Sequence, residues 1–250
     1  MAAGTAAKNS TTVGRDMSLT NPEVAMEVQL VSSKKELREY DAFKNIALTD
    51  AANKIKAGEK FLNSYPNSNL VKYVYPVLVV CYIQAGQIDK GVSTAQKDFE
   101  VNKKDFRTMA VLSQTLARSY NPAAADADGQ LAKADDYGKK ALQGSEELKK
   151  PEGVSDEAFT AWKKDTQAMA HGGMGLVALR RNQYPEAIVE IEKAISLNDG
   201  DQTNYYLLGV ANMNSDHPGE AARAFAKCAA IQGNLQAECS KAAGGAKKTN

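Results

Sequence analysis

A repeat of 34 residues in the C-terminal third limits the fold more than any other feature of this sequence. Each copy predicts a helix with a glycine inside it, a short turn, and a second helix that begins near a proline. A helix pair of this length cannot bury its apolar face alone, so the copies must stack on neighbouring pairs. The identities at this offset are Gly175 with Gly209, Glu186 with Glu220, Ala187 with Ala221, and Lys193 with Lys227.

Small and large residues occupy matching places in the two copies. Glycine lies inside the first helix at Gly175 and Gly209, and alanine lies in the second helix at Ala187 and Ala221. A glycine inside a helix costs about 1 kcal/mol relative to alanine. We expect close packing of the two helices to offset that cost, because small residues admit the bulk of a neighbour.

These residues resemble the tetratricopeptide repeat (TPR), a 34-residue unit with preferred residue types at fixed positions. With Gly209 at position 8, the family's preferred types fall on Tyr205, Leu208, Ala221 and Phe225. In the preceding copy His171 stands where the family prefers an aromatic residue, so we expect it to pack as a helix residue and not to bind a ligand.

The resemblance extends more weakly toward the N-terminus, through residues 72–105 and 106–142. It implies an all-α fold, an α-α superhelix of about five helix pairs with a C-terminal capping helix. The expected organisation is a disordered leader over 1–32, a repeat domain over 33–243 and a flexible tail over 244–250. Within the domain, 168–201 and 202–235 match the repeat best. In 72–105 the second helix departs from the pattern, because Gly91 replaces the alanine and Asp98 falls at a position for a small apolar residue.

The net charge and the absence of known catalytic and binding motifs exclude several classes of function. The formal net charge of +1 gives no general attraction to nucleic acid or to anionic membranes. The sequence contains no phosphate-binding glycine loop and no nucleophile motif, and two distant histidines with three cysteines make no zinc pattern. We therefore expect no enzyme activity, no cofactor, no metal and no nucleic-acid partner.

The sequence allows two predictions for the cellular compartment of this protein. The sequence as given shows no signal peptide and no apolar run long enough to cross a membrane, which favours the cytoplasm without membrane insertion. The alternative is a periplasmic or envelope-associated TPR assembly factor, if the N-terminus is truncated. The segment FLNSYPNS resembles repeat ends of such proteins, and this alternative predicts a disulfide between Cys228 and Cys239.

The resemblance also implies where a partner binds. First helices of TPR units line a concave groove, and the fold implies a non-enzymatic scaffold or adaptor that binds a protein, as a peptide or a helix, in that groove. We expect Arg118 and Arg180 to orient an acidic or carboxyl-bearing ligand. The alternative is that extra helices or a second copy, as a homo-oligomer, cover the same residues. The groove residues are Tyr73, Val80, Ile83, Gln84, Arg107, Gln114, Arg118, Met169, Leu176, Leu179, Arg180, Tyr206, Val210, Met213 and Asn214.

Overall fold

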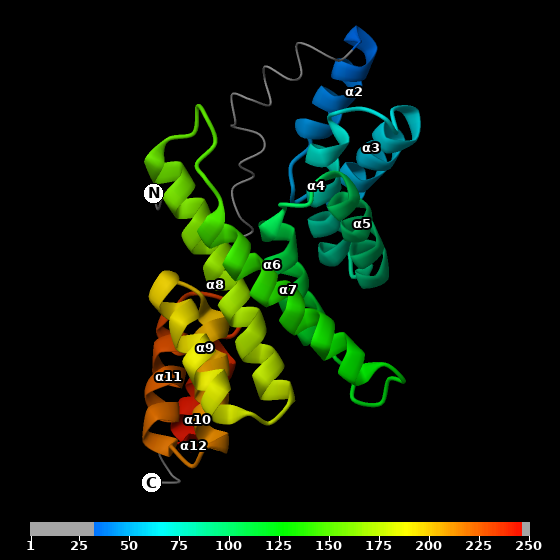
Figure 1. Ribbon diagram of the computed structural model, residues 1–250. Helices are drawn as coiled ribbons and strands as arrows, with labels where there is room; N and C mark the ends of the chain where they lie inside the picture. Colours follow the sequence, from blue (N-terminus) through cyan, green and yellow to red (C-terminus); the bar gives the residue numbers. More distant parts are fainter. Residues whose placement is uncertain (1–32, 247–250) are drawn as a thin grey trace, which may run out of the picture.

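The computed structural model describes residues 33–246, and in that range it contains eleven helices and no strand (Figure 1). The expected leader over 1–32 and the last residues, 247–250, lie outside the described residues. Five helix pairs and a closing helix follow one another, as the repeat pattern predicts. The helices are α2 (Lys34–Lys44), α3 (Ala51–Ser64), α4 (Val71–Gln84), α5 (Ile88–Val101), α6 (Phe106–Arg118), α7 (Ala127–Glu147), α8 (Asp156–Arg180), α9 (Tyr184–Leu197), α10 (Gln202–Asn214), α11 (Pro218–Ala230) and α12 (Gln236–Ala246).

The closing helix is longer than expected. It includes Gly244, Gly245 and Ala246, which the sequence places in a flexible tail, and Ala246 is buried. The helices within residues 33–246 include no candidate for a membrane span.

Short polar side chains set where several helices begin. Ser33, Asp50, Asp105 and Ser155 each accept a hydrogen bond from the backbone N–H three residues further on. These bonds satisfy N–H groups that have no partner inside the helix. The second helices α9 and α11 have no such cap and begin instead with proline in the first turn.

The same turn joins the two helices in three of the pairs. One residue of each turn has a positive φ: Gly86 at 72°, Asn182 at 59° and Asp216 at 56°. The next residue donates its N–H to a carbonyl five residues earlier, which closes the end of the first helix. These bonds run from Gln87 to Tyr82 (2.8 Å), from Gln183 to Ala178 (2.9 Å) and from His217 to Asn212 (2.9 Å).

Glycines permit close helix contact, as the sequence predicts. A Cβ atom on Gly209 would lie 2.4 Å from Cε1 of Phe225, and one on Gly175 would lie 2.6 Å from Cγ1 of Ile191. Side chains from the second helix of each pair therefore fill the space over the glycine of the first helix.

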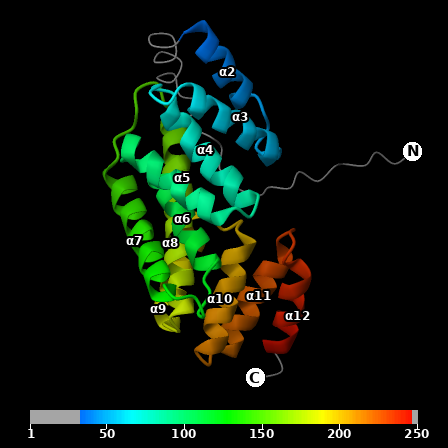
Figure 2. The same cartoon turned by 90° about the vertical axis from the view of Figure 1, so that its right-hand side faces the viewer.

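Helix α8 is the centre of the superhelix, because it packs along α6, α7 and α9. Figures 1 and 2 show α2–α5 at one end of the molecule and α10–α12 at the other, with α6–α8 between them. The N-terminal pairs meet the rest through a small core made of Val79, Ala95 and Leu112. The fold therefore consists of helix pairs that stack on one another in chain order.

Candidate partner-binding cleft

Helices α8 and α10 lie side by side and run in the same direction. Near the middle of α8, a Cβ on Gly172 would lie 3.0 Å from Oδ1 of Asn204. Further along both helices, Ala178 and Leu179 share a core with Leu207. The residue numbers increase together on the two helices, which is the arrangement expected of first helices in successive repeats.

A cleft of about 350 Å³ lies between these two helices. Its lining is mainly aliphatic and aromatic, whereas the exposed Arg180, Asn182 and Asn214 provide polar groups. A concave apolar surface with a few polar groups is the usual form of a binding site. The lining residues are Leu176, Leu179, Arg180, Asn182, Tyr184, Tyr206, Leu207, Val210 and Asn214.

Arg180, which lines the cleft, and Arg118, at the end of α6, have no acidic ion-pair partner among the described residues. The Nε–H group of Arg180 donates to the carbonyl of Ala117 at 3.3 Å, so Arg180 lies beside the end of α6, where Arg118 follows. By contrast, Arg107 forms an ion pair with Asp165 at 2.6 Å. Arg118 and Arg180 are therefore available to pair with a negative charge on a ligand.

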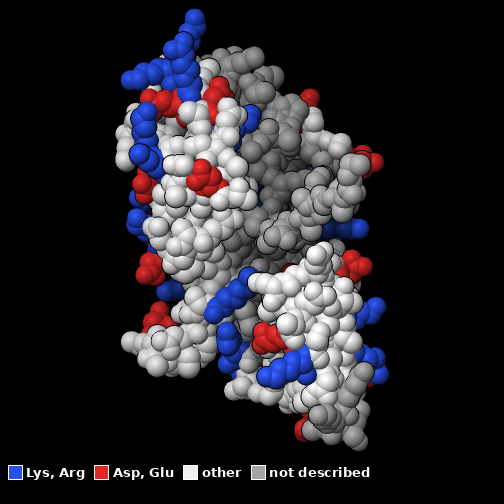
Figure 3. Space-filling view, turned by 180° about the vertical axis from the view of Figure 1, so that it is seen from behind, with Lys and Arg blue, Asp and Glu red and all other residues white. Residues whose placement is uncertain are grey.

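The surface view shows how charge is distributed over one face of the molecule. On the face shown in Figure 3, Lys and Arg side chains gather around the hollow between the upper and lower parts of the molecule, with an acidic side chain among them. Opposite charges elsewhere on the surface are interspersed, in agreement with the net charge of +1.

One wall of the cleft is supported from behind by the closing helix. Tyr206 and Val210 line the cleft and also pack against the core that α11 and α12 share, together with Met213. The hydroxyl of Tyr206 donates to Oε1 of Glu238 on α12 at 2.9 Å. This hydrogen bond, together with burial and the charge of Glu238, raises the pKa of Tyr206 above its ordinary value.

The structure brings six of the fifteen sequence-predicted groove residues together in this cleft and places the others elsewhere. Arg107 is occupied by its ion pair with α8, Met169 packs against the core around Met109, and Met213 lies under α12. Those in the cleft are Leu176, Leu179, Arg180, Tyr206, Val210 and Asn214. Arg118 does not line the cleft, but it follows Ala117, whose carbonyl accepts a hydrogen bond from Arg180.

The predicted groove residues on α4 lie toward the other end of the molecule. Tyr73 packs against the N-terminal core, and Ile83 packs against the core of Val79 and Ala95. Val80 is half-buried and Gln84 is exposed. Gln114 of α6 lies over Gly172, with its Nε2 atom 3.1 Å from where a Cβ would be. None of these residues lines the α8–α10 cleft.

Three lining residues were not predicted. Asn182 and Tyr184 belong to the turn after α8 and the start of α9, and Leu207 is on α10 beside Tyr206. Asn182 and Tyr184 could have been predicted because they closely follow Arg180, a predicted groove residue, in the sequence. The prediction uses only selected first-helix positions of the repeat, so it excludes Asn182 and Tyr184 as turn and second-helix residues. Leu207 is on a first helix but not at a selected position.

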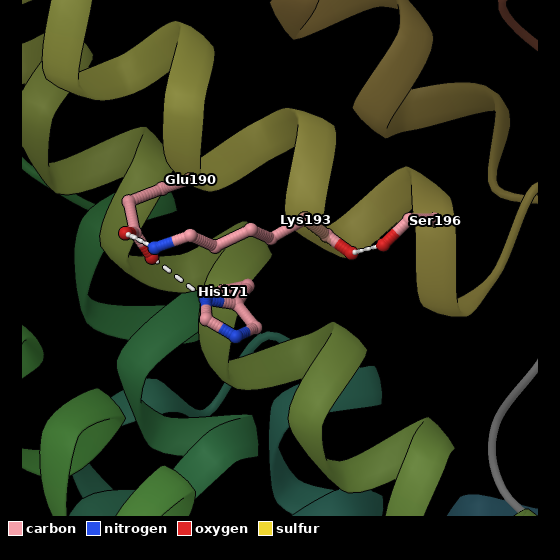
Figure 4. Close-up of polar contacts among 4 residues, drawn as sticks. All are labelled: His171, Glu190, Lys193 and Ser196. Carbon is pink, nitrogen blue, oxygen red and sulfur yellow. Dashed lines mark hydrogen bonds and ion pairs between the residues drawn. The ribbon is translucent and has the colours of Figure 1, made fainter.

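His171 links two helices of one repeat. Its Nδ1 atom lies 2.7 Å from Oε2 of Glu190 on α9, and Lys193 donates to the other oxygen of Glu190 at 2.8 Å (Figure 4). The hydrogen bond from His171 is the main reason that the pKa of Glu190 is lowered, and Lys193 adds to it. His171 therefore packs as a helix residue, and no group of three metal-ligating side chains exists within residues 33–246.

The three cysteines differ in state. Cys228 on α11 and Cys239 on α12 form a disulfide, with their Cα atoms 5.8 Å apart. Cys81 on α4 is a free thiol, and burial raises its pKa to about 11. Because the thiolate is the reactive form of cysteine, Cys81 is not set up as a nucleophile.

The fold defined by these stacked pairs is the TPR superhelix. No protein-family model matches the sequence, and no curated protein matches it. Solved TPR structures do match the fold. One is TTC0263, a thermophilic TPR protein of Thermus thermophilus, with a TM-score of 0.60 and 15% identity over 83% of this chain and 98% of that one.

Two further structures have the same architecture. PilW, a type IV pilus biogenesis factor, aligns with a TM-score of 0.60 and 14% identity over 87% of this chain and 93% of its own. The MamA protein aligns with a TM-score of 0.52 and 18% identity over 90% and 95%. At these identities the likeness establishes the architecture, and function must be argued from the cleft.

Proposed function

We propose that this protein is a non-enzymatic interaction scaffold that binds a peptide or helix of a partner protein in the α8–α10 cleft. The observation that supports this most is the cleft itself. It lies between the first helices of two successive repeats and has apolar walls. Its lining includes Arg180, which has no acidic partner among the described residues and contacts the end of α6, where Arg118 follows.

The chemistry of the cleft defines the ligand that fits it. Leu179 and Leu207 are partly exposed and offer apolar surface, and burial of such surface stabilises a complex by about 25 cal/mol per Å². Arg118 and Arg180 add orientation, because a guanidinium pairs with a carboxylate through two parallel hydrogen bonds. The ligand is therefore an apolar segment with an acidic side chain or a terminal carboxylate beside it.

The test is capture of the partner from extracts of the source cells by immobilised protein. Replacing Leu179→Glu and Tyr206→Glu puts charge into the wall and should abolish capture while helicity is retained. Val189→Glu is the matched control, since Val189 is on the neighbouring helix α9, is 51% exposed and does not line the cleft. Equal capture by the cleft variant and the control would contradict the proposed role of the cleft.

A second candidate is favoured by the disulfide. Disulfides persist in oxidising compartments and are rare in the cytosol, so a buried Cys228–Cys239 bond supports the periplasmic or envelope-associated assembly factor. PilW, which has the same fold, is described as a pilus biogenesis factor. Mass spectrometry of unreduced protein from its native compartment should find the two cysteines in one cross-linked peptide. Free thiols at both positions would favour the cytoplasm instead.

A further inference from the structure

Helix α12 has little apolar surface of its own with which to stay docked. Its sequence, QAECSKAAGGA, contains no large apolar side chain, and it contributes mainly alanines to the shared core. Two glycines, Gly244 and Gly245, further weaken the helix, since each costs about 1 kcal/mol relative to alanine. Its docking against α10 and α11 therefore depends on other interactions.

Several such interactions fix the start of the helix. The disulfide ties Cys239 to Cys228 of α11, and both residues are fully buried. The side chain of Gln202 on α10 donates to the carbonyls of Cys228 (3.2 Å) and Ile231 (2.9 Å). The same side chain accepts from the N–H of Leu235 at 3.1 Å. The start of α12 is thus fixed to α10 and α11 together.

The disulfide is adjacent to the residue that holds the cleft wall. Cys239 follows Glu238, and Glu238 accepts the hydrogen bond of the Tyr206 hydroxyl. Tyr206 lines the cleft and packs on Phe225 with ring centroids 5.7 Å apart. A continuous series of contacts therefore leads from the disulfide through Glu238 to the binding surface.

We propose that the Cys228–Cys239 disulfide is a compartment-dependent lock that completes the cleft, with α12 holding Tyr206 in place only after the two thiols have been oxidised. This inference rests on the proposed function of the cleft. In the oxidation step, the thiols of Cys228 and Cys239 lose two electrons and two protons to a disulfide-bearing oxidant. One S–S bond forms in this chain as one breaks in the oxidant, which leaves as a dithiol.

Because both sulfur atoms are buried, the disulfide forms once during maturation and is not reduced afterwards. A thiolate must reach a sulfur atom to reduce the bond, and neither sulfur is accessible while α12 is docked. The oxidised protein therefore keeps its cleft once formed, whereas a chain kept in a reducing compartment has α12 undocked and Tyr206 without Glu238.

The lock can be tested without a ligand by amide hydrogen exchange. The samples are the oxidised protein, the protein reduced with dithiothreitol during refolding, and the Cys228→Ser/Cys239→Ser variant. We expect exchange in α12 to accelerate by about tenfold or more in the last two, with α8 unchanged as an internal control. Unchanged exchange in α12 would overturn the lock. Equal acceleration in α8 would also overturn it, because the disulfide would then stabilise the whole domain.

The phenol of Tyr206 gives a second measurement, which a merely stabilising disulfide would not change. Its titration is isolated as the difference between the protein and a Tyr206→Phe variant, with Tyr205→Phe as the matched control. Loss of the disulfide should lower the Tyr206 pKa toward its ordinary value, by at least as much as Glu238→Gln in the oxidised protein, because undocking of α12 removes burial as well as Glu238. A Tyr206 titration that does not respond to reduction would contradict the proposal.

The two proposals fail differently. If no partner is captured at all, the proposed function fails while exchange and titration still decide the lock. If capture is abolished by Leu179→Glu but is the same with and without the disulfide, the proposed function stands and the lock is overturned.

Discussion

In the α4–α5 pair and in the two pairs formed by α8–α11, a glycine allows the two helices to approach closely. The glycine is on the second helix in α4–α5 and on the first helix in the other two pairs. In the C-terminal pairs the small residue is on the first helix, at Gly175 and Gly209, and a large side chain of the second helix fills the space. In the N-terminal pair the first helix has Val79 at that place and the second helix has Gly91. A Cβ on Gly91 would lie 3.2 Å from Cγ1 of Ile83 and 3.6 Å from the carbonyl of Val79. The repeat thus preserves close approach of the helices, and the helix that has the small residue can change.

The N-terminal and C-terminal pairs differ more in their buried ionisable side chains than in their glycine contacts. Among the described residues, the two buried side chains that can ionise in water, apart from cysteine and tyrosine, are Lys54 and Asp98, and both belong to the N-terminal pairs. Lys54 donates to the carbonyls of Lys44 and Ile46, at 3.1 and 2.7 Å, and so closes the end of α2. Asp98 stands where the C-terminal pairs have Ala194 and Cys228. The N-terminal half therefore combines repeat geometry with polar anchoring.

Asp98 is the least satisfied of these groups. Neither carboxylate oxygen has a hydrogen-bond donor within reach. Burial, and next the charge of Asp105, raise its pKa to about 9, so the group is protonated at neutral pH. A protonated Asp98 can donate to Asp105, which caps α6 by accepting from the N–H and hydroxyl of Thr108. Protonation therefore avoids a buried, unpartnered negative charge on α5.

The largest expected effect comes from filling a glycine contact in the C-terminal region. Gly209→Val would place side-chain atoms inside the ring of Phe225 and should lower the free energy of unfolding by about 3 kcal/mol or more. Urea denaturation measures the loss. Gly244→Ala is the control, because no atom lies within 4 Å of a Cβ there. Equal stability of the two variants would show that the α10–α11 contact is looser than described.

A smaller effect, with a defined pH dependence, is expected at Asp98. The folded state binds its proton up to a pKa of about 9 and the unfolded state only to 3.8, so the contribution of Asp98 to stability is lost as pH rises between these values. Asp98→Asn keeps a donor toward Asp105 and removes this titration. The variant should be more stable than the parent at pH 8 by at least about 1 kcal/mol, and by less at pH 5. A difference that stays constant between pH 5 and 8 would contradict a proton shared at this site.

The smallest effect is expected at the glycine of the N-terminal pair. Gly91→Ala meets Ile83 at a distance that a small shift relieves, and alanine favours the helix by about 1 kcal/mol. The two contributions should leave the free energy of unfolding within about 0.5 kcal/mol of the parent. A loss as large as that of Gly209→Val would mean that the two regions do not differ in how tightly their helices approach.

Much of the fold follows from the sequence because the repeat fixes which residues face one another. The glycine contacts and the prolines at second-helix starts follow from residue spacing, and the closing helix follows from the resemblance to the TPR family. The site was predicted only in part, since a repeat position indicates a face of a helix and not what covers that face. Met213 lies under α12 and Arg107 is neutralised by Asp165, and neither fact is visible in the 34-residue pattern. The cleft residues Asn182 and Tyr184 come from a turn whose geometry depends on the positive φ of Asn182.

The central claim is that the partner of this protein occupies the α8–α10 cleft. The most direct measurement is site-specific photo-crosslinking in the source cells, with a photoreactive phenylalanine analogue placed at Leu179 or, as the control, at Val189 on α9. We predict that Leu179 yields a cross-linked partner and that Val189 does not. A partner that cross-links from Val189 and not from Leu179 would contradict the account.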